Sequence, residues 1–188
     1  MLRPYSYSFG SLPKNAASPS SSGKGTPGHH HQPPPFQEVS CFLTYVCFSQ
    51  ASPEKIAGSR LALQSFREVE FECNHFDWSK NSIFKYVLIE VSSLLVPDVR
   101  QLVRGMTSAE FHADSAEPAL RQIDKAGLCH RVIGGGRIRY VAKTQTLTVY
   151  GYSQGFPWPE GKYMNELAAQ IIHRNFPNLV VDWSNEGY

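Results

Sequence analysis

The sequence predicts an α+β fold: a single small domain with a mixed β-sheet flanked by two helices, and a disordered N-terminal head. From residue 83 onward, short apolar or alternating runs typical of strands follow one another. Two segments with the apolar spacing of a helix face, near residues 114–126 and 162–175, interrupt these runs. Residues 1–37 contain no Asp or Glu and are rich in Ser, Pro, Gly and His, a composition typical of disorder.

After this head we expect an N-terminal extension, residues 38–79, whose packing is left open. Within it, Val39–Phe48 and Arg67–Cys73 have the composition of strands, with a possible short helix between them at Ser52–Phe66. The extension carries no recognisable chemistry. Residues 80–188 form the main domain and contain every motif that points to a function.

The main domain opens with two predicted strands, Ile83–Val91 and Arg100–Gly105. The first is apolar on both faces, as expected of a central strand. Lys85 lies within it on a face that is otherwise apolar, so its ammonium group either reaches out to water or meets an anion. Arg104, at the end of the second strand, is a weaker candidate for the same role.

A helix follows, with Asp114 or Ser115 as its predicted N-terminal cap. With that start Pro118 falls in the first turn, where proline is tolerated. Thr107 and Glu110 form a possible capping box for an earlier start, but that start would place the proline in the helix interior. The later start is therefore preferred.

The rest of the domain predicts a hairpin, a second helix and a last strand. A strand pair separated by a glycine triplet spans residues 129–142, and a turn at residues 143–145 leads into a strand at residues 146–152. The second helix covers about residues 162–175 and stops before a proline. Residues 178–184 close the domain as a strand.

His112 precedes the predicted helix start. Free backbone N–H groups and the positive end of the helix dipole make that place suitable for an anion. A neutral imidazole there could also accept a proton. The alternatives are a histidine that only hydrogen-bonds its neighbours, or a metal ligand. The second is disfavoured because His130 and His173 are far away in sequence and no zinc-type spacing surrounds His112.

Two glycine-containing segments could contact a ligand. Gly134–Gly136 would let a ligand approach the backbone closely, or would simply form a bulge or tight bend, and it fits neither phosphate-loop consensus. Arg137 follows it and could clamp a phosphate, or be an ordinary exposed strand arginine. The small polar residues Ser153–Gly155 could line an anion site or form a plain turn.

Charge and composition exclude several classes of partner. The head carries Arg3, Lys14 and Lys24, whereas the remaining chain has 15 basic and 16 acidic residues, so no basic face for nucleic acid is expected. No apolar run approaches the roughly 18 residues of a membrane-spanning helix. The four cysteines form no CxxC pair, and the Pro- and Gly-containing head argues against a transit peptide, which together favour the cytoplasm.

Five segments, taken in order over roughly residues 80–188, resemble the janus/phosphohistidine phosphatase family: IFKYVLIEV, VRGMTSAEFHAD, GGGRIRY, VYGYSQGF and WSNEGY. The resemblance implies a small α+β domain that hydrolyses phosphohistidine in a protein substrate without a metal or another cofactor. It implies that His112, in EFHAD, is the catalytic proton acceptor. The implied substrate-binding residues are Lys85, Arg137, Ser153, Gln154, Gly155, Ala113 and Arg104.

Two functions are compatible with this resemblance. One is a phosphohistidine phosphatase that acts as a monomer, in which His112 either activates water or attacks phosphorus itself. The other is a non-catalytic, phosphate-recognising regulator of the janus type, involved in sex differentiation. The segment Pro157–Gly161 looks particular to this chain, and Arg139, just past the glycine triplet, adds a positive charge whose orientation is left open; both could alter the choice of substrate.

Overall fold

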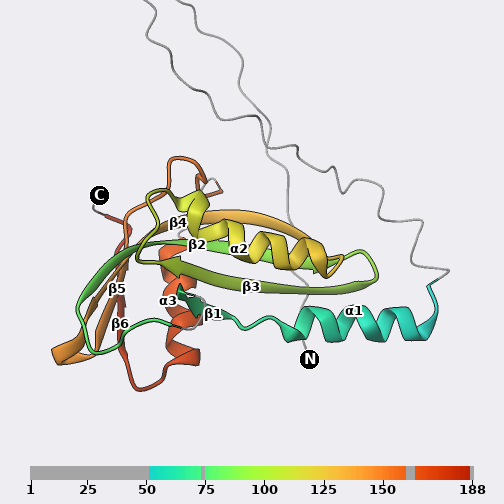
Figure 1. The fold of residues 1–188 in the computed structure, drawn as a ribbon, viewed down its shortest axis with the longest axis horizontal. Coiled ribbons are helices and arrows are strands. Elements are labelled where there is room, and N and C mark those ends of the chain that lie inside the picture. Colours follow the sequence, from blue (N-terminus) through green and yellow to red (C-terminus); the bar gives the residue numbers. More distant parts are fainter. Residues whose placement is uncertain (1–50, 73–74, 160–163, 187–188) are drawn as a thin grey trace, which may run out of the picture. The chain divides into compact units, whose positions relative to one another are not determined.

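A computed structural model describes residues 51–72, 75–159 and 164–186, and its architecture confirms the predicted α+β class. The head, residues 1–37, and the predicted strand Val39–Phe48 lie outside the described residues. One sheet contains six strands in the order β1-β3-β2-β4-β5-β6 (Figure 1). The elements are α1 (Pro53–Ser65), β1 (Val69–Phe71), β2 (Ser82–Ser93), β3 (Val96–Met106), α2 (His112–Lys125), β4 (Cys129–Val141), β5 (Thr146–Tyr150), α3 (Met164–Asn175) and β6 (Val180–Trp183).

The sheet is mixed because its two edge strands run parallel to their neighbours. β2 pairs antiparallel with β3 and β4, and β4 pairs antiparallel with β5, whereas β1 and β6 are parallel to β3 and β5. β2 lies at the centre, and its residues Tyr86–Ile89 are fully buried. This agrees with an apolar sequence on both faces, which only a strand covered on both sides can bury.

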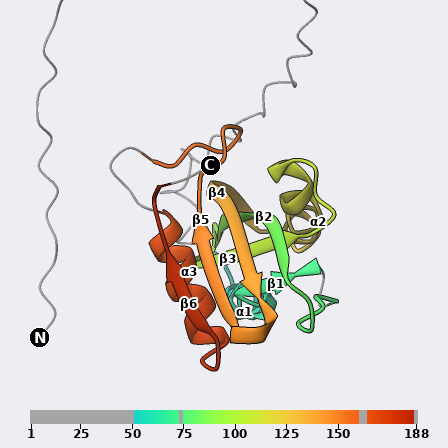
Figure 2. The same cartoon turned by 90° about the vertical axis from the view of Figure 1, so that its left-hand side faces the viewer.

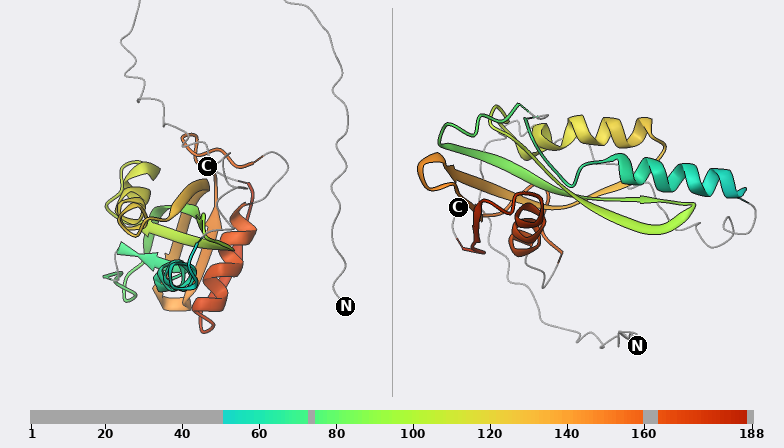
Figure 3. Two further views of the ribbon diagram at one scale, coloured as in Figure 1. Left: turned by 90° about the vertical axis from the view of Figure 1, so that its right-hand side faces the viewer. Right: turned by 90° about the horizontal axis from the view of Figure 1, so that it is seen from below.

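The helices cover different faces of the sheet. In Figure 2, α2 and α3 lie on opposite sides of strands β4 and β5. Figure 3 shows α1 on the same side as α2. Val87 and Ile89 of β2 accordingly pack with Leu63 of α1 and with α2, while Tyr86 and Leu88 pack with α3. Among the described residues, no helix combines the length and apolar character needed to cross a membrane.

The stretch before the main domain contributes to the same sheet. Ser52 caps α1 by accepting a hydrogen bond from the Lys55 N–H, and Pro53 occupies the first turn, so the predicted short helix is confirmed. β1 falls within the predicted strand at residues 67–73 and pairs in parallel with β3, with Val69 opposite Val103. Its side chains at 69 and 71 are buried, so this strand completes one edge of the core.

The start of α2 differs from the prediction. The helix begins at His112, with Phe111 in the N-cap position, and Pro118 lies in its second turn. The reason is that Asp114 acts from the third helical position: its carboxylate accepts a 2.7 Å hydrogen bond from the Phe111 N–H. Pro118 removes one helical hydrogen bond, which would have gone to the Asp114 carbonyl near the open end of the helix.

The glycine triplet lies within a strand and not in a loop. β4 runs without interruption from Cys129 to Val141, and the register with β2 shifts between Leu88 and Ile89, which pair with Gly134 and Val132. Ile133 is therefore the extra residue of a β-bulge, as the bulge interpretation of the triplet predicted. Gln145, in a left-handed conformation, completes the predicted hairpin turn into β5.

Candidate functional site

His112 is the first residue of α2, and its ring reaches down to the middle of β4. The ring Nε2 lies 3.0 Å from the Gly136 carbonyl oxygen, and the side chain is half-buried. A carbonyl can only accept a hydrogen bond, so Nε2 carries the proton. A neutral ring then keeps its lone pair on Nδ1, which is the nitrogen able to accept a proton.

Two cations lie beside this histidine. Lys85 of β2 and Arg137 of β4 are directly opposed in the sheet, and both side chains are partly exposed. Lys85 lies two residues before Val87, which is buried toward α2, so it projects on the α2 side of the sheet, as the strand pattern predicted. Cβ atoms of opposed residues are about 5 Å apart, and like-charged side chains directly opposite each other in a sheet are destabilising. An anion held between Lys85 and Arg137 would remove this repulsion.

The environment favours an uncharged imidazole. Burial is the largest cause that holds the pKa of His112 below its ordinary value, because the charged ring would lose hydration. The hydrogen bond to Gly136 opposes this shift, while the charges of Lys85 and Arg137 add to it. The site therefore combines a neutral proton acceptor with two permanent positive charges.

The N-terminus of α2 adds polar groups to the same place. The N–H groups of the first helical residues, His112 and Ala113, have no carbonyl partner within the helix. Ala113 is exposed. Ser115 is buried and donates a 3.2 Å hydrogen bond to the Lys85 carbonyl, which ties the first turns of α2 to β2. Backbone amides, two cations and one imidazole thus surround one position on the sheet.

The loop after β5 closes another side of the site. Gly151 has a positive φ of 68°, which turns the chain out of β5. Ser153 is buried, and its hydroxyl accepts a hydrogen bond from the Phe156 N–H, whereas Gln154 and Gly155 are exposed. Ser153 lies near the glycine triplet: a Cβ built on Gly135 would be 3.2 Å from Ser153 Cβ and 3.2 Å from His112 Cδ2.

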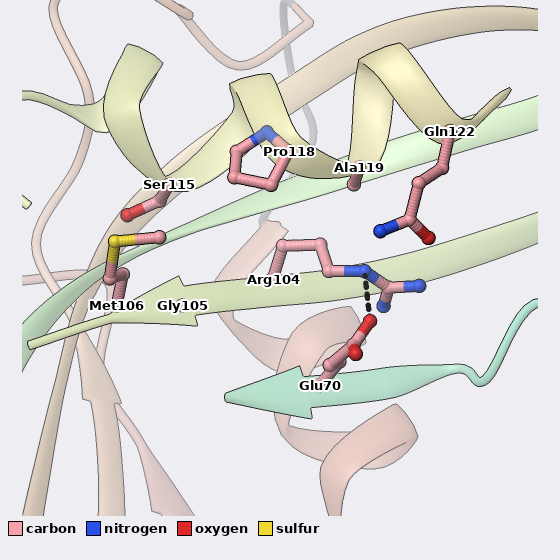
Figure 4. Close-up of a pocket in the computed structure, with 8 residues that line it drawn as sticks. All are labelled: Glu70, Arg104, Gly105, Met106, Ser115, Pro118, Ala119 and Gln122. Carbon is pink, nitrogen blue, oxygen red and sulfur yellow. Dashed lines mark ion pairs between the residues drawn. The ribbon is translucent and has the colours of Figure 1, made fainter. Parts of the chain in front are cut away.

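Arg104, another predicted substrate-binding residue, has a different set of partners. It is buried, opposite Val87, and its Nε lies 3.4 Å from a carboxylate oxygen of Glu70 (Figure 4). Its terminal nitrogens donate to the carbonyls of Arg67 and Val103. The guanidinium thus joins β3 to β1 beside a small cavity of about 20 Å³. A direct contact between Arg104 and substrate stays a prediction.

Three contributors to the site were missed by the sequence reasoning. The Gly136 carbonyl orients His112, and no sequence pattern marks a backbone acceptor. Trp158 donates its indole N–H to the Gly135 carbonyl at 3.1 Å, and the unusual segment Pro157–Gly161 was the available signal. Asn165 is fully buried on α3 and donates to the Gly151 carbonyl. A polar residue on the buried face of a helix could have identified it.

Close packing around Gly135 makes a testable prediction. We expect Gly135→Ala to displace His112 and, if this position is an anion site, to lower its affinity for inorganic phosphate by about tenfold or more. The added Cβ would lie 2.7 Å from the Tyr86 carbonyl oxygen, and a backbone atom cannot move aside cheaply. Phosphate affinity and thermal unfolding are measured together. Gly58→Ala on α1, where nothing lies within 4 Å, is the control and should be neutral or slightly stabilising. Unchanged phosphate affinity of Gly135→Ala would contradict this packing.

Comparison with known proteins shows the family of this chain. Residues 72–180, more than half of the chain, match the family described as Janus/Ocnus. The chain belongs to the Janus/Ocnus family. The resemblance inferred from the five sequence segments is thereby confirmed. His112, the cations Lys85 and Arg137, and Ser153 all lie within the matched range.

Janus/Ocnus relatives bear two kinds of name. The 14 kDa phosphohistidine phosphatases of Sus scrofa and Homo sapiens are each 32% identical over 117 residues, covering 60% of this chain and 90% of the relative. The sex-regulated protein janus-A of Drosophila melanogaster is 36% identical over 110 residues, covering 58% of this chain and 78% of the relative. Both kinds of name occur among relatives of similar identity to this chain.

Proposed function

We propose that the chain is a metal-independent phosphohistidine phosphatase that hydrolyses the P–N bond of a phosphorylated protein. The observation that supports it most is that His112 lies beside Lys85 and Arg137. The hydrogen bond from His112 Nε2 to the Gly136 carbonyl leaves Nδ1 as the proton acceptor next to these two cations. Phosphatase names among the relatives support the same activity. The chain acts in the cytoplasm as a monomer, independently of nucleic acid and membranes.

The chemistry requires little beyond these groups. In hydrolysis, a water oxygen forms a bond to phosphorus as the P–N bond breaks, giving inorganic phosphate and free histidine. Lys85, Arg137 and the first amides of α2 stabilise the negative charge on the phosphoryl oxygens. His112 accepts the proton that water loses, and the departing imidazole nitrogen takes up a proton from solvent. In the alternative route, Nδ1 of His112 attacks phosphorus and water then cleaves the phosphorylated enzyme.

A second candidate is a phosphate-recognising regulator of the janus type, active in sex differentiation. The janus-A relatives favour it, because their identity to this chain reaches 36%. The same cations would then bind a phosphorylated partner without turnover. A chain incubated with a phosphohistidine peptide and a metal chelator separates the two. Release of phosphate supports the phosphatase, and saturable binding without release supports the regulator. Absence of any phosphate binding would exclude both.

The charges next to His112 make a prediction about its titration. We expect Lys85→Gln to raise the pKa of His112, since one of the two positive charges that oppose ring protonation is removed. The ring is neutral and able to accept a proton above its pKa, so the acid limb of activity should move to higher pH. NMR titration of the imidazole measures the shift directly, without substrate. Lys125→Gln, at the far end of α2, is the control and should leave the titration unchanged. An unchanged or lowered pKa in Lys85→Gln would contradict the proposed arrangement.

A further inference from the structure

Arg139 projects from the sheet on the same side as the site cations. Along β4, Ile138 and Tyr140 are buried against α3, whereas Arg139 between them is exposed. Strand residues two positions apart share a face, so Arg139 lies on the face of Arg137, about 7 Å further along the strand. Within the described part of the chain, Arg139 forms neither an ion pair nor a side-chain hydrogen bond.

The row of residues across the sheet at Arg139 forms an open surface. Arg139 pairs with Ile83 on β2 and Thr148 on β5, and Thr148 pairs with Asp182 on β6. Ile83 is 61% exposed, although its neighbour Phe84 is buried on the opposite face. An exposed isoleucine and an exposed arginine side by side show that α2 does not cover the sheet here. This surface is continuous with the row of Lys85 and Arg137.

We propose that Arg139 is a specificity-determining residue that selects an acidic side chain next to the phosphohistidine of a protein substrate. This inference rests on the proposed function for the identity of the substrate. In an extended polypeptide, side chains two residues apart point the same way with a spacing of about 7 Å. A peptide that runs along β4 with its phosphohistidine between Lys85 and Arg137 therefore places its second neighbour over Arg139 and Ile83. The Arg139 guanidinium favours a carboxylate on this second-neighbour side chain, and the aliphatic part of that side chain can pack on Ile83. Asp182 lies two strands away in the same row, about 10 Å from the position of Arg139, and in the described part of the chain the two side chains form no ion pair.

The test uses peptides that carry a stable phosphonate-triazole analogue of phosphohistidine, with Glu or with Lys at both second-neighbour positions. Affinities for the wild-type chain are measured by calorimetry at low ionic strength. We expect the Glu peptide to bind about three- to tenfold more tightly than the Lys peptide, as for an exposed ion pair plus the removal of a repulsion. Arg139→Glu should reverse this preference, and Arg139→Gln should nearly abolish it. Added salt should weaken it in the wild type.

The ratio of the two affinities measures only the preference for Glu over Lys, because a general loss of folding or of phosphate binding lowers the affinity for both peptides alike. Arg131→Glu is the control: it makes the same charge change on β4, eight residues or about 27 Å away, where Arg131 pairs with Glu90. It should keep the wild-type ratio. An equal ratio in the wild type and Arg139→Glu would overturn the inference, even if phosphohistidine is hydrolysed. An Arg139-dependent ratio without hydrolysis would leave the inference standing and remove only the catalytic activity.

Discussion

We expect the His112→Ala variant to release phosphate from a phosphohistidine peptide about 10²–10⁴ times more slowly than the wild-type chain. The variant removes the Nδ1 lone pair that accepts the proton, but it leaves Lys85, Arg137 and the first amides of α2 in place. Phosphate should therefore still bind, with an affinity changed far less than the rate. Single-turnover release of phosphate and calorimetric binding of inorganic phosphate measure the two quantities separately.

His130→Ala supplies the matched control for this variant. His130 lies near the start of β4 and pairs with Asp124 at the surface, so its removal should leave turnover within about twofold of the wild-type rate. The thermal unfolding of both variants shows whether either change disturbs the fold. Equal rates of phosphate release for His112→Ala and the wild type would exclude a catalytic role for His112. Phosphate binding that is retained without turnover would then favour the regulator function.

Elements with strong local signals were predictable from the sequence. The prediction of the central strand β2 was correct because a short run that is apolar on both faces is typical of a strand buried on both sides. The hairpin after β4 was correct because short polar turns between alternating strands have distinctive sequences. The Lys85 side chain was placed on the correct face, since alternation along a strand follows from backbone geometry alone.

Features that depend on long-range contacts were beyond such reasoning. The predicted helix cap was three or four residues too late because Asp114 can cap a helix either from the cap position or from the third residue, and sequence does not separate these. Two partners of Arg104, Glu70 of β1 and the flanking residue Arg67, lie more than 30 positions earlier in the sequence. The carbonyl of Gly136 became a histidine acceptor only when α2 packed over β4. Each outcome depends on tertiary packing.

A buried polar network joins the central strand, the site loop and the C-terminal segment. The Tyr86 hydroxyl donates a 2.5 Å hydrogen bond to Asn165 Oδ1, and burial raises the pKa of Tyr86 far above its ordinary value, which keeps it a donor. Asn165 Nδ2 donates to the carbonyls of Gly151 and Ser184 at 2.9 and 2.7 Å. One amide thus holds the loop that carries Ser153 against β2.

We expect Asn165→Leu to lower the free energy of unfolding by about 4 kcal/mol, because the Tyr86 hydroxyl, the buried Gly151 carbonyl and the partly buried Ser184 carbonyl lose their partner at once. The melting temperature should fall by roughly 10 °C. Leucine has the same branching as asparagine but is larger, so no cavity is left, and overpacking adds to the cost of the lost hydrogen bonds. Chemical denaturation measures the change. Gln170→Leu, an exposed site on the same helix, is the matched control and should shift stability by less than about 0.5 kcal/mol.

A double-mutant cycle decides whether Tyr86 and Asn165 act together. In Tyr86→Phe the Asn165 oxygen loses its donor, and in Asn165→Leu the Tyr86 hydroxyl loses its acceptor, so each single change leaves the other member of this hydrogen bond unsatisfied. The double variant removes both groups, and its cost should be smaller than the sum of the two single costs by about 1 kcal/mol or more. Simple additivity would show that the hydroxyl and the amide do not depend on each other. The loop would then be held mainly by the contacts of Asn165 with Gly151 and Ser184.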